Sequence, residues 1–571
     1  MSENVYSKER KELQAQGLAP EWMTTGGWQM FKQKYLFDAA NPKEQYQRIA
    51  STLAKHIEGN YPDWWEKEYS KEYTWEQAFF DILWNQHLSP STPVLSNTGT
   101  NRGCTVSCSG TYVGDNVYSF YANLQENAVL TQEGFGTSSY LGDIRPRGTA
   151  ISRGGKASGI LPVFKAFVQM SSDISQGSNR RGAWAGSVPI DHPDWDEVSD
   201  FVNEHPDDVN AAWIVKDAFR DKLLAKDKDS LRRWGKALKV KMTTGKGYLT
   251  FIDKINRKRP QMYVDKGLFI KASQLCQEIT LFSDEEHTFT CVLSSVNAYT
   301  YRKWSPKLVY IATVFLDCVC EEFLQRARNI KGLEKAVRFT EKSRALGLGV
   351  MGLSSLFQEE RIVFGSMESM YLNTEIFKKL KDESEEASKW LAEVLGEPEW
   401  CKGHGVRNTH TTAVAPTKST ALIMGGMSEG INIDPAMTFT QTTTAGEVDR
   451  MSPVLLKLMK ERGVYNKKVV QDIVEHLGSV QHVDWLDSHE KAVFRTAFET
   501  DQLSILRLAS QRQRYLSQMQ SLNLFFSGDE SEEKIGEVML QALLDENILS
   551  VYYAYSKRGV LASTGECEAC Q

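Results

Sequence analysis

Short apolar segments alternate with helical patterns from about residue 210 to residue 430, and this alternation constrains the fold more than any other feature. Strands and helices in alternation are typical of an α/β body. No Pro/Ser-rich linker divides the chain, and no internal repeat of fixed period is visible. Length alone would suggest several small domains for 571 residues, but the missing linkers favour one large body.

The composition narrows the class of protein. The chain has 67 Lys and Arg against 73 Asp and Glu, and 41% of its residues are hydrophobic, which is typical of a folded globular protein. The nearly balanced charge gives no reason to expect a nucleic-acid partner. The most apolar run, Leu308–Cys320, is too short for a membrane span and contains Asp317, so we expect a core element and no membrane partner.

The start of the chain carries no apolar segment of the kind found in secretory signals, so we expect a cytoplasmic protein. Its nine cysteines should then be thiols and not a structural disulfide framework.

Local patterns predict several elements. The first 80 residues or so are helical and rich in aromatic residues, and the Gly/Ser/Thr-rich tract from Leu88 to Asp115 should be loop and short strand. Two amphipathic helices flank a Gly/Arg-rich loop; one begins just after Asp115, and the other carries Val163, Phe164, Phe167, Val168 and Ile174. Near the end, SEEKIGEVMLQALLDEN is helical, ILSVYYAY is strand-like, and a small polar tail follows.

Cys567 and Cys570 form a Cys-x-x-Cys pair in that tail. Such a pair can close a redox-active disulfide or supply half of a zinc site. Zinc would need a second pair, and Cys104/Cys108 and Cys318/Cys320 have unsuitable spacing. A redox role is favoured, while zinc binding and no function are the alternatives.

Gly347, Gly349 and Gly352 form a G-x-G-x-x-G within RALGLGVMGL. A dinucleotide site would require a strand before the motif. The preceding EKAVRFTEKSRA has a helical pattern, so a packing role for these glycines is favoured.

The segment APTKSTALI, residues 415–423, is typical of the start of a helix. Hydroxyl groups and free backbone N–H groups at such a position can hold a phosphate. Simple N-capping is the alternative.

Cys276 and Glu278 are two residues apart in SQLCQEITL, so on a β-strand they would share one face. A neighbouring carboxylate raises the pKa of a thiol and makes it a poor nucleophile. The pair suits a thiol that exchanges a hydrogen atom while Glu278 handles protons. A core cysteine beside an edge carboxylate is the alternative.

A series of segments occurs in a characteristic order: LSPSTPVLSN, SCSGTYVGDNVYSF, the Gly/Arg loops, SQLCQEI, CVLSSVN, ALGLGVMGL, RNTHTTAVAPTKSTALIMGGMSEGI, QMQSLNLFF, VYYAYSKRG and GECEAC. Together they resemble the catalytic large (alpha) subunit of a class I ribonucleotide reductase, from about Leu88 to Gln571. The resemblance implies an α/β fold, a ten-stranded α/β barrel with the radical cysteine on a central finger loop. It divides the chain into a helical region (1–86), the barrel (87–553) and a redox tail (554–571).

The resemblance also implies roles for single residues. Cys276 matches the thiyl-radical residue that abstracts the 3′-hydrogen of a ribonucleotide, and Glu278 matches the group that takes the 3′-hydroxyl proton. Cys108 and Cys291 match the reducing pair, which ends the turnover as a disulfide. Gln274 stands where the family usually has a substrate-binding Asn. The positions that match the substrate site are Thr92, Ser107 and Gly134, with the diphosphate at Pro416, Thr417, Lys418, Ser419 and Thr420.

Radical supply and reductant follow from the same resemblance. Tyr552 and Tyr553 match a relay that carries the radical from a separate small (beta) subunit to Cys276, so the radical-generating metal cofactor belongs to that subunit and no metal is expected here. Cys567 and Cys570 would exchange with the internal disulfide and be reduced by thioredoxin or glutaredoxin.

Regulation is implied at Asp115 and Arg145, which match the specificity site for a deoxynucleotide or ATP; Asp115 as a helix cap is an alternative or an additional role. Loops near residues 176–186 and 204–212 would pass the signal to the substrate, and the two amphipathic helices match the homodimer elements. Cys108 comes early and the first 85 residues do not resemble an ATP-cone, so we expect a short form that lacks this cone.

The expected activity is reduction of ribonucleotides, most simply ribonucleoside 5′-diphosphates, to 2′-deoxyribonucleotides for DNA precursor synthesis. Three alternatives stay open: an adenosylcobalamin-dependent (class II) reductase, an inactive regulatory relative, and a thiol–disulfide oxidoreductase that uses only the tail pair.

Overall fold

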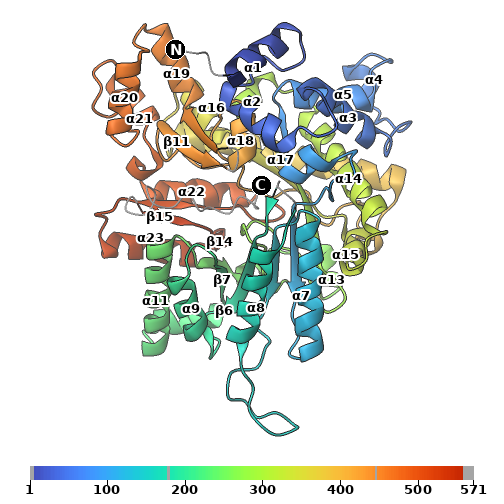
Figure 1. The fold of residues 1–571 in the computed structure, drawn as a ribbon, viewed down its shortest axis with the longest axis vertical. Helices are drawn as coiled ribbons and strands as arrows, with labels where there is room; N and C mark the ends of the chain where they lie inside the picture. The colour runs from blue at the N-terminus through green and yellow to red at the C-terminus, as the bar shows by residue number, and fades with distance from the viewer. Residues whose placement is uncertain (1–4, 177–179, 444–445, 557–571) are drawn as a thin grey trace.

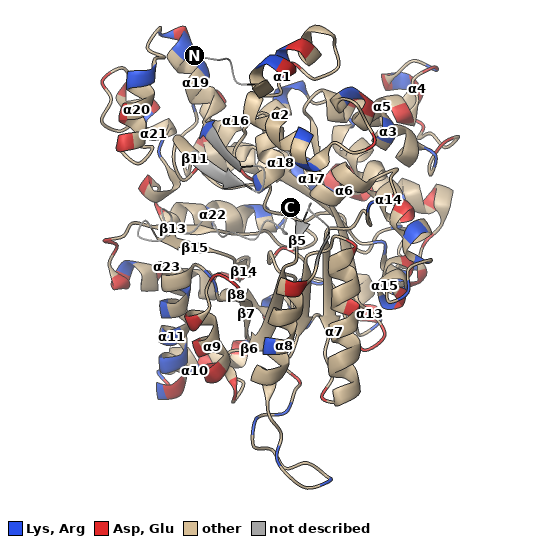
Figure 2. Cartoon of the chain, in the orientation of Figure 1, with Lys and Arg blue, Asp and Glu red and all other residues tan. Residues whose placement is uncertain are grey.

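The computed structural model describes residues 5–176, 180–443 and 446–556 (Figure 1). Its main sheet has nine strands in the order β1-β9-β2-β3-β6-β7-β8-β14, with β10 paired to β9 outside this path. Charged residues lie mainly on the helices around this sheet, and the strands are largely uncharged (Figure 2).

Five neighbouring strands form one half of the sheet: β2 (Cys108–Tyr112), β3 (Thr137–Tyr140), β6 (Trp184–Pro189), β7 (Asn210–Val215) and β8 (Tyr248–Phe251). Each pairs in parallel with the next. All but one of their residues are buried, as expected for parallel strands whose two faces are both covered. The connecting helices are α7 (Val117–Gln132), α8 (Ile160–Asp173), α9 (Trp195–Glu204), α10 (Asp217–Leu224) and α11 (Lys228–Thr244).

The second half begins with β9 (Phe289–Asn297), which pairs antiparallel with β2 and parallel with β10 (Leu346–Met351). Isolated bridges Leu348↔Thr412 and Val414↔Gln520 carry the pairing onward. Further along the chain, β13 (Leu524–Phe526) pairs in parallel with β15 (Ala554–Ser556). Strand β14 (Ser550–Val551), just before β15, pairs antiparallel with β8 of the first half. The second half therefore also contributes five segments (β9, β10, 412–414, 520–526 and 550–556), and the expected ten-stranded α/β barrel is confirmed.

The N-terminal helices pack on the outside of the barrel. They are α1 (Val5–Ala15), α2 (Thr25–Met30), the π-helix Phe31–Tyr35, α3 (Pro42–Ala54), α4 (Trp65–Glu68) and α5 (Trp75–Trp84). They share one apolar core with α14 (Leu308–Ala327) and α17 (Met367–Leu395), and Figure 1 shows this helical layer above the sheet. The expected helical N-terminal region and the core element at Leu308–Cys320 are both confirmed. Among the described residues, no helix is long and apolar enough to cross a membrane.

The remaining elements complete the chain. They are β1 (Leu88–Pro90), α6 (Thr92–Asn97), β4 (Ser175–Gln176), β5 (Arg180–Arg181), α12 (Ile252–Arg257), α13 (Gln261–Asp265), the 3-10 helix Ala298–Lys303, α15 (Glu334–Ser343), α16 (Leu353–Glu359), the 3-10 helix Glu399–Cys401, α18 (Lys418–Ile423), β11 (Thr438–Thr443), β12 (Gly446–Met451), α19 (Pro453–Glu461), α20 (Lys467–Glu475), α21 (Ser488–Val493), the 3-10 helix Ala497–Glu499, α22 (Gln502–Gln513) and α23 (Glu532–Leu544).

Three local expectations need correction or qualification. Helix α6 lies inside the Gly/Ser/Thr-rich tract that we expected to be loop and strand, because Pro93 in its first turn and the polar N-cap position Ser91 favour a short helix there. Asn116 caps α7 with its side chain, so Asp115 is not the cap. Cys276 lies on a loop and not on a strand, as the family resemblance implied.

The glycine motif has the expected packing role. Gly347 lies in β10, which follows helix α15. A Cβ at residue 347 would lie 2.3 Å from Leu293 Cδ2 and 3.1 Å from Cys291 Sγ, so only glycine lets β10 approach β9 this closely.

Candidate active site

Cys108 and Cys291 are direct partners across the antiparallel strands β2 and β9. The 182 residues that separate them in sequence contain four of the five parallel strands of the first half, and the closure of the barrel brings the ends of this segment together. Both thiols are buried. Burial raises the pKa of the Cys291 thiol, while a hydrogen bond from Gln518 lowers it, so the resting group is a thiol and not a thiolate.

A loop between α13 and β9 carries Cys276 and Glu278 into the barrel, where both side chains are fully buried. Its tip turns at Gln277, whose φ of 64° lies in the left-handed region. Side-chain hydrogen bonds hold this turn, because Thr250 Oγ donates to Gln277 Oε1 and Ser550 Oγ donates to the Gln277 carbonyl at 2.9 Å. The barrel wall therefore fixes the loop tip from two strands.

Glu278 is held by Ser521, whose hydroxyl lies 2.8 Å from Glu278 Oε2 and 2.6 Å from the carbonyl oxygen of Cys276. Burial raises the pKa of Glu278 to about 7, while hydrogen bonding by Gln274 and Ser521 acts in the opposite direction. The Ser521 hydroxyl has a single hydrogen, so it donates to only one of these two oxygens at a time. Glu278 can thus gain or lose a proton near neutral pH.

Gln274 links the loop to the thiol pair. Its Oε1 accepts from Ile279 N at 3.1 Å and from Ser273 Oγ at 3.0 Å, and its Nε2 lies 4.0 Å from Cys108 Sγ. The carboxamide thus spans from the finger loop toward one member of the pair. Gln274 is longer than the Asn that the family usually has here, but it carries the same amide group, which contacts both the finger loop and Cys108.

Sequence reasoning assigned no role to two residues of the segment QMQSLNLFF that touch the site. Gln518 Nε2 lies 3.5 Å from Cys291 Sγ, and Gln518 Oε1 accepts from Thr280 N at 3.0 Å. Ser521 holds Cys276 and Glu278, as described above. The segment carried the resemblance as a whole, but nothing in its pattern shows which of its polar residues face the thiols.

Cys276 shares one buried cluster with both expected relay tyrosines. The cluster contains Ala185, Ala212, Tyr248, Leu275, Cys276, Tyr552 and Tyr553. The Tyr552 and Tyr553 ring centroids are 4.3 Å apart. Tyr248, which sequence reasoning did not single out, contacts both rings, with centroid distances of 4.7 Å to Tyr552 and 5.3 Å to Tyr553. Three mutually contacting aromatic rings therefore share one buried cluster with Cys276.

A small hydroxyl-rich cavity contains part of the expected phosphate segment. Its lining is Ser89, Ser91, Leu293, Ser294, Ser295, Ala415, Pro416, Thr417 and Thr420. Ser107 Oγ donates to Ser91 Oγ at 2.8 Å, and Thr92 Oγ bonds the Tyr35 hydroxyl at 3.0 Å. Gly134 takes a φ of 99° in the turn before β3, where Gly136 N donates to the Ser107 carbonyl. The structure thus gathers Ser107 and three of the phosphate residues; Lys418 and Ser419 lie in the first turn of α18 beside them.

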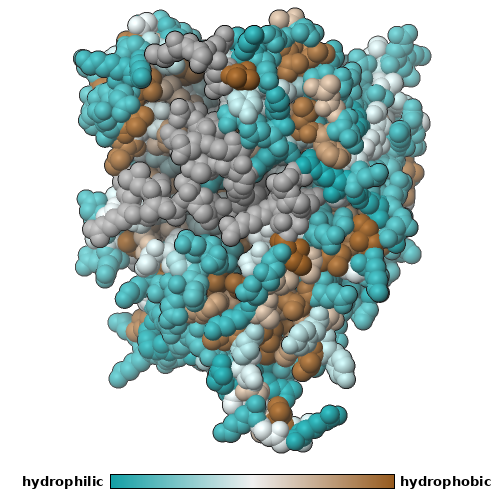
Figure 3. All heavy atoms as spheres, viewed as in Figure 1, coloured by the Kyte–Doolittle hydropathy of each residue, from teal (hydrophilic) through white to brown (hydrophobic). Residues whose placement is uncertain are grey.

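Asp115, just before α7, forms an ion pair with Arg145, in the segment between β3 and α8; Figure 1 shows a loop of this segment projecting from the body. Arg145 Nε donates to Asp115 Oδ2 at 2.6 Å, and Arg145 N donates to Asp115 Oδ1 at 3.1 Å. Apolar side chains gather on the face over α7 and α8 (Figure 3), and on α7 Val117, Tyr118 and Tyr121 are all more than half exposed.

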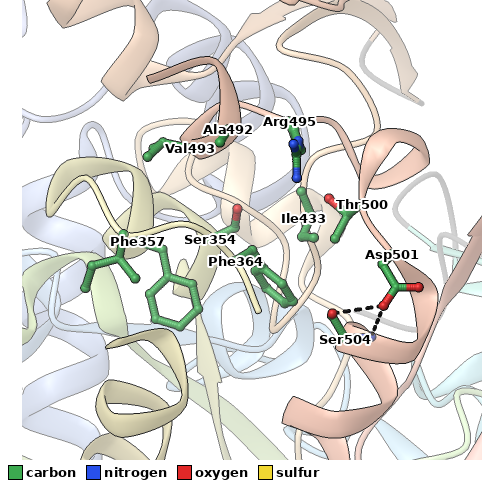
Figure 4. Close-up of a pocket in the computed structure, with 11 residues that line it drawn as sticks. Ser354, Phe357, Phe364, Ile433, Ala492, Val493, Arg495, Thr500, Asp501 and Ser504 are labelled. Carbon is green, nitrogen blue, oxygen red and sulfur yellow. Dashed lines mark hydrogen bonds between the residues drawn. The ribbon is translucent and has the colours of Figure 1, made fainter. Parts of the chain in front are cut away.

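Two further regions hold no part of the expected site. The pocket in Figure 4 is lined by residues of α16, α21 and α22, and Asp501 there caps α22 by accepting from Ser504. Cys567 and Cys570 lie outside the described residues.

The comparisons with known proteins agree with this geometry. Residues 106–232, 225–401 and 398–554 match the family "Ribonucleotide reductase, barrel domain", and residues 22–103 match "Ribonucleotide reductase, all-alpha domain". A solved structure, the class Id ribonucleotide reductase alpha subunit of Actinobacillus ureae, superposes with a TM-score of 0.85 at 32% identity, covering 96% of this chain and 99% of that chain.

Curated relatives span two kinds of reductase. The ribonucleoside-diphosphate reductase large subunit of Invertebrate iridescent virus 3 is 28% identical over 616 residues, covering 93% of each chain. The vitamin B12-dependent ribonucleoside-diphosphate reductase of Thermoplasma acidophilum is 28% identical over 526 residues, covering 86% of this chain and 66% of that protein.

The fold and the comparisons together define an oxidoreductase barrel, and its interior holds buried thiols. The chain belongs to the ribonucleotide reductase family, as a large, catalytic subunit. Residues 22–103, which contain helices α2 to α6, match the family's all-alpha domain, and this agrees with the expectation that the N-terminal region does not resemble an ATP-cone.

Proposed function

We propose that the protein reduces ribonucleoside 5′-diphosphates to 2′-deoxyribonucleotides with a radical delivered by a separate small subunit. In the net reaction, one ribonucleotide and the two thiols of Cys108 and Cys291 give one deoxyribonucleotide, one water and one disulfide. The product would serve DNA precursor synthesis.

The observation that carries the proposal is the single buried cluster of Cys276, Tyr552 and Tyr553. A hydrogen atom would pass from Tyr552 to an oxidised Tyr553 and then from Cys276 to Tyr552, which leaves a thiyl radical at Cys276. The oxidant is a radical cofactor of the small subunit, and its metal belongs to that partner. Contacting rings favour this route because short donor–acceptor distances are what proton-coupled transfer requires.

At the substrate, the Cys276 radical would remove the 3′-hydrogen and Glu278 would take the 3′-hydroxyl proton. Among the described residues, Glu278 Oε1 has no hydrogen-bond partner, although it is buried. This oxygen is therefore suited to accept from a substrate hydroxyl, which would relieve the cost of an unpaired buried acceptor. Loss of the 2′-hydroxyl as water then draws two electrons from Cys108 and Cys291.

The diphosphate would bind in the cavity at the N-terminal end of α18. There Thr417, Thr420 and the serines of β1 and β9 supply hydroxyl groups. No side chain of the described residues caps α18, so the first N–H groups of that helix are suited to an anion. Lys418 at the start of α18 adds a positive charge.

Effector binding, dimerisation and re-reduction complete the proposal. A deoxynucleotide or ATP would bind near Asp115 and Arg145, where the guanidinium is partly exposed and suited to a phosphate. The exposed apolar residues of α7, together with the neighbouring helix α8, would form the homodimer contact. The tail pair Cys567 and Cys570 would reduce the internal disulfide. Thioredoxin or glutaredoxin would then reduce the tail pair.

An adenosylcobalamin-dependent reductase is the second candidate, because vitamin B12-dependent relatives align over most of the barrel. The two candidates differ in what must be added. The test is turnover of CDP by the purified chain with reductant and either a small subunit or adenosylcobalamin.

Turnover only with the small subunit, abolished by Cys276→Ser and by Tyr552→Phe, supports the proposal. Turnover with adenosylcobalamin alone, and full activity of Tyr552→Phe, would favour the second candidate. Comparing CDP with CTP as substrates in the same assay decides between diphosphate and triphosphate.

A further inference from the structure

Two histidines and an aspartate lie together at the surface near the end of α20. Asp472 lies on α20, His476 follows one turn later at the end of the helix, and His482 follows after a short turn. One possible ligand atom from each side chain lies within 4.8 Å of the others, and no other three His, Cys, Asp or Glu side chains of the described residues meet this spacing. Figure 1 shows α20 at the edge of the molecule beside α19 and α21, away from the barrel sheet.

The carboxylate of Asp472 faces both imidazole rings. His482 Nε2 lies 2.7 Å from Asp472 Oδ2, and His476 Nδ1 lies 3.5 Å from Asp472 Oδ1. The two rings stack, with centroids 3.6 Å apart and planes at 17°. Nitrogen and oxygen atoms from three side chains therefore gather in one small region of the surface.

The backbone between the two histidines brings them together. Leu477 has a φ of 56° and Gly478 a φ of 76°, both in the left-handed region. Gly478 N donates to the Ile473 carbonyl at 2.8 Å, which is the long bond of a Schellman motif. Glycine usually occupies the position that Leu477 takes here, and a leucine in this conformation carries a backbone cost. The turn reverses the chain and holds His482 against His476.

We propose that Asp472, His476 and His482 bind one Zn²⁺ ion, with water in the fourth position. Imidazole nitrogen and carboxylate oxygen are ordinary zinc ligands at about 2.0–2.2 Å, so two ligand atoms of a tetrahedral site lie about 3.4 Å apart. The separations of 2.7 and 3.5 Å lie on either side of that value, so small rotations of the side chains would admit the ion. Two nitrogen ligands favour zinc over calcium or magnesium, which prefer oxygen.

The ion would fasten the turn after α20 to the helix itself. This turn contacts the chain just before β11, because Met437 N donates to the Gly478 carbonyl at 2.9 Å. Ile473 and Val480, on either side of the turn, are buried in the same apolar cluster as Met437. Zinc would therefore stabilise the lobe that contains α19, α20 and α21, and would take no part in the chemistry inside the barrel.

The experiment titrates Zn²⁺ into the full-length chain and into His476→Ala and His482→Ala by isothermal titration calorimetry. Both histidines are exposed, so the variants should fold. Each variant should weaken binding at this site by at least the 10–100-fold, roughly, that loss of an outer-shell partner costs. His489→Ala removes an exposed histidine of the same lobe, whose Nε2 contacts the Arg361 carbonyl at 2.8 Å, and should bind zinc as the wild type does.

The tail thiols Cys567 and Cys570 offer a second pair of zinc ligands, and a Co²⁺ titration separates the two sources. Cobalt bound by thiolates absorbs strongly in the near ultraviolet through charge transfer, whereas a nitrogen–oxygen site shows only the weaker visible bands. His482→Ala should lose visible absorption and keep any thiolate absorption. Zn²⁺ should also slow hydrogen exchange of the Gly478 amide in the wild type but not in His482→Ala.

The remaining outcomes count against the proposal. Zinc binding that is equal in the wild type and in His482→Ala would overturn it, as would a wild-type chain that binds zinc only through thiolates. Either result would leave Asp472 and the two histidines as a hydrogen-bonded surface cluster. Zinc binding that depends on both histidines but leaves exchange of the Gly478 amide unchanged would overturn the stabilising role of the ion.

Discussion

Cys108 and Cys291 face one another across the seam where the antiparallel strands β2 and β9 join the two halves of the barrel. Directly opposed residues in such a pair have Cα atoms about 4.5 or 5.5 Å apart. Both values lie within the range of about 4.4–6.8 Å that a disulfide spans. The two thiols can therefore be joined without moving either strand.

The first prediction concerns this pair. One turnover with CDP and without external reductant should leave a Cys108–Cys291 disulfide, which mass spectrometry of the digested protein would detect. Cys318, which is buried in α14, should stay reduced and serve as an internal control, whereas Cys320 on the same helix lies near enough to Cys291 to influence its pKa. Oxidation of Cys318 in place of the pair would contradict the assignment.

The second prediction concerns Glu278. Glu278→Gln should abolish turnover, because an amide cannot take the 3′-hydroxyl proton, while nucleotide binding persists. Wild-type kcat should rise with pH through about 7, where the carboxyl group ionises. Glu285→Gln, an exposed change in the same loop, is the matched control and should leave the profile unaltered.

The same substitution should change stability with a definite sign. The raised pKa means that the folded state holds a proton that the unfolded chain loses above pH 4.5, so the native state loses stability as pH rises from 4.5 to about 7. At pH 8, Glu278→Gln should therefore raise the free energy of unfolding by about 3 kcal/mol. Urea titrations should show this gain vanishing near pH 4; an equal gain at both pH values would contradict the cause.

The third prediction concerns Gln518, which contacts Cys291 Sγ and accepts from Thr280 N. Gln518→Leu removes a hydrogen bond that lowers the pKa of the Cys291 thiol. Disulfide formation after one turnover should slow several-fold, measured by quenched mass spectrometry. Gln471→Leu on the exposed face of α20 is the control; an unchanged rate in Gln518→Leu would show that this contact does not tune the thiol.

The fourth prediction concerns the buried ion network around Asp317. Its Oδ1 accepts from Arg344 at 2.9 Å and from Asn408 at 2.9 Å, and its Oδ2 accepts from Arg407 at 3.0 Å. Burial alone would raise the pKa of Asp317, but the two guanidinium groups lower it to about 2. The carboxylate therefore stabilises the fold above pH 4, and this contribution is lost as pH falls through 2.

Asp317→Asn should lower the free energy of unfolding at pH 7 by about 3–5 kcal/mol, because it removes the carboxylate that Arg344 and Arg407 share and leaves only Glu321 paired with Arg344. Asp382→Asn removes an exposed helix pair with Lys378 and should change it by less than about 0.5 kcal/mol. Equal effects of the two changes in a urea titration would contradict this account.

The fold class, the helical N-terminal region and the buried thiols could be predicted from the sequence. Ordered motifs and hydrophobic periodicity both depend on which residues lie in the core. Sequence reasoning placed Cys276 on a strand until the resemblance pointed to a loop, since Cys276 and Glu278 two residues apart are compatible with either. The left-handed turn at Gln277 is set by contacts from Thr250 and Ser550, which are far away in sequence. Local patterns cannot encode such contacts.

The fine structure of the site was also beyond the sequence. Ser521, Gln518 and Tyr248 occupy decisive positions, yet a serine, a glutamine and a strand tyrosine are common residues with no distinctive spacing. The division into residues 1–86, 87–553 and 554–571 stays a prediction, as do the roles of Cys567 and Cys570.

Gly347 has a consequence for a site whose bonding changes in every cycle. A Cβ at residue 347 would lie 3.1 Å from Cys291 Sγ and 2.3 Å from Leu293 Cδ2, so a side chain there would press on the thiol as well as on its neighbour in β9. A sulfur that alternates between a thiol and a disulfide must swing about its Cα–Cβ bond, and a rigid interior offers few places for such a swing. In this barrel, the missing side chain at residue 347 is what keeps β10 from pressing on the Cys291 sulfur.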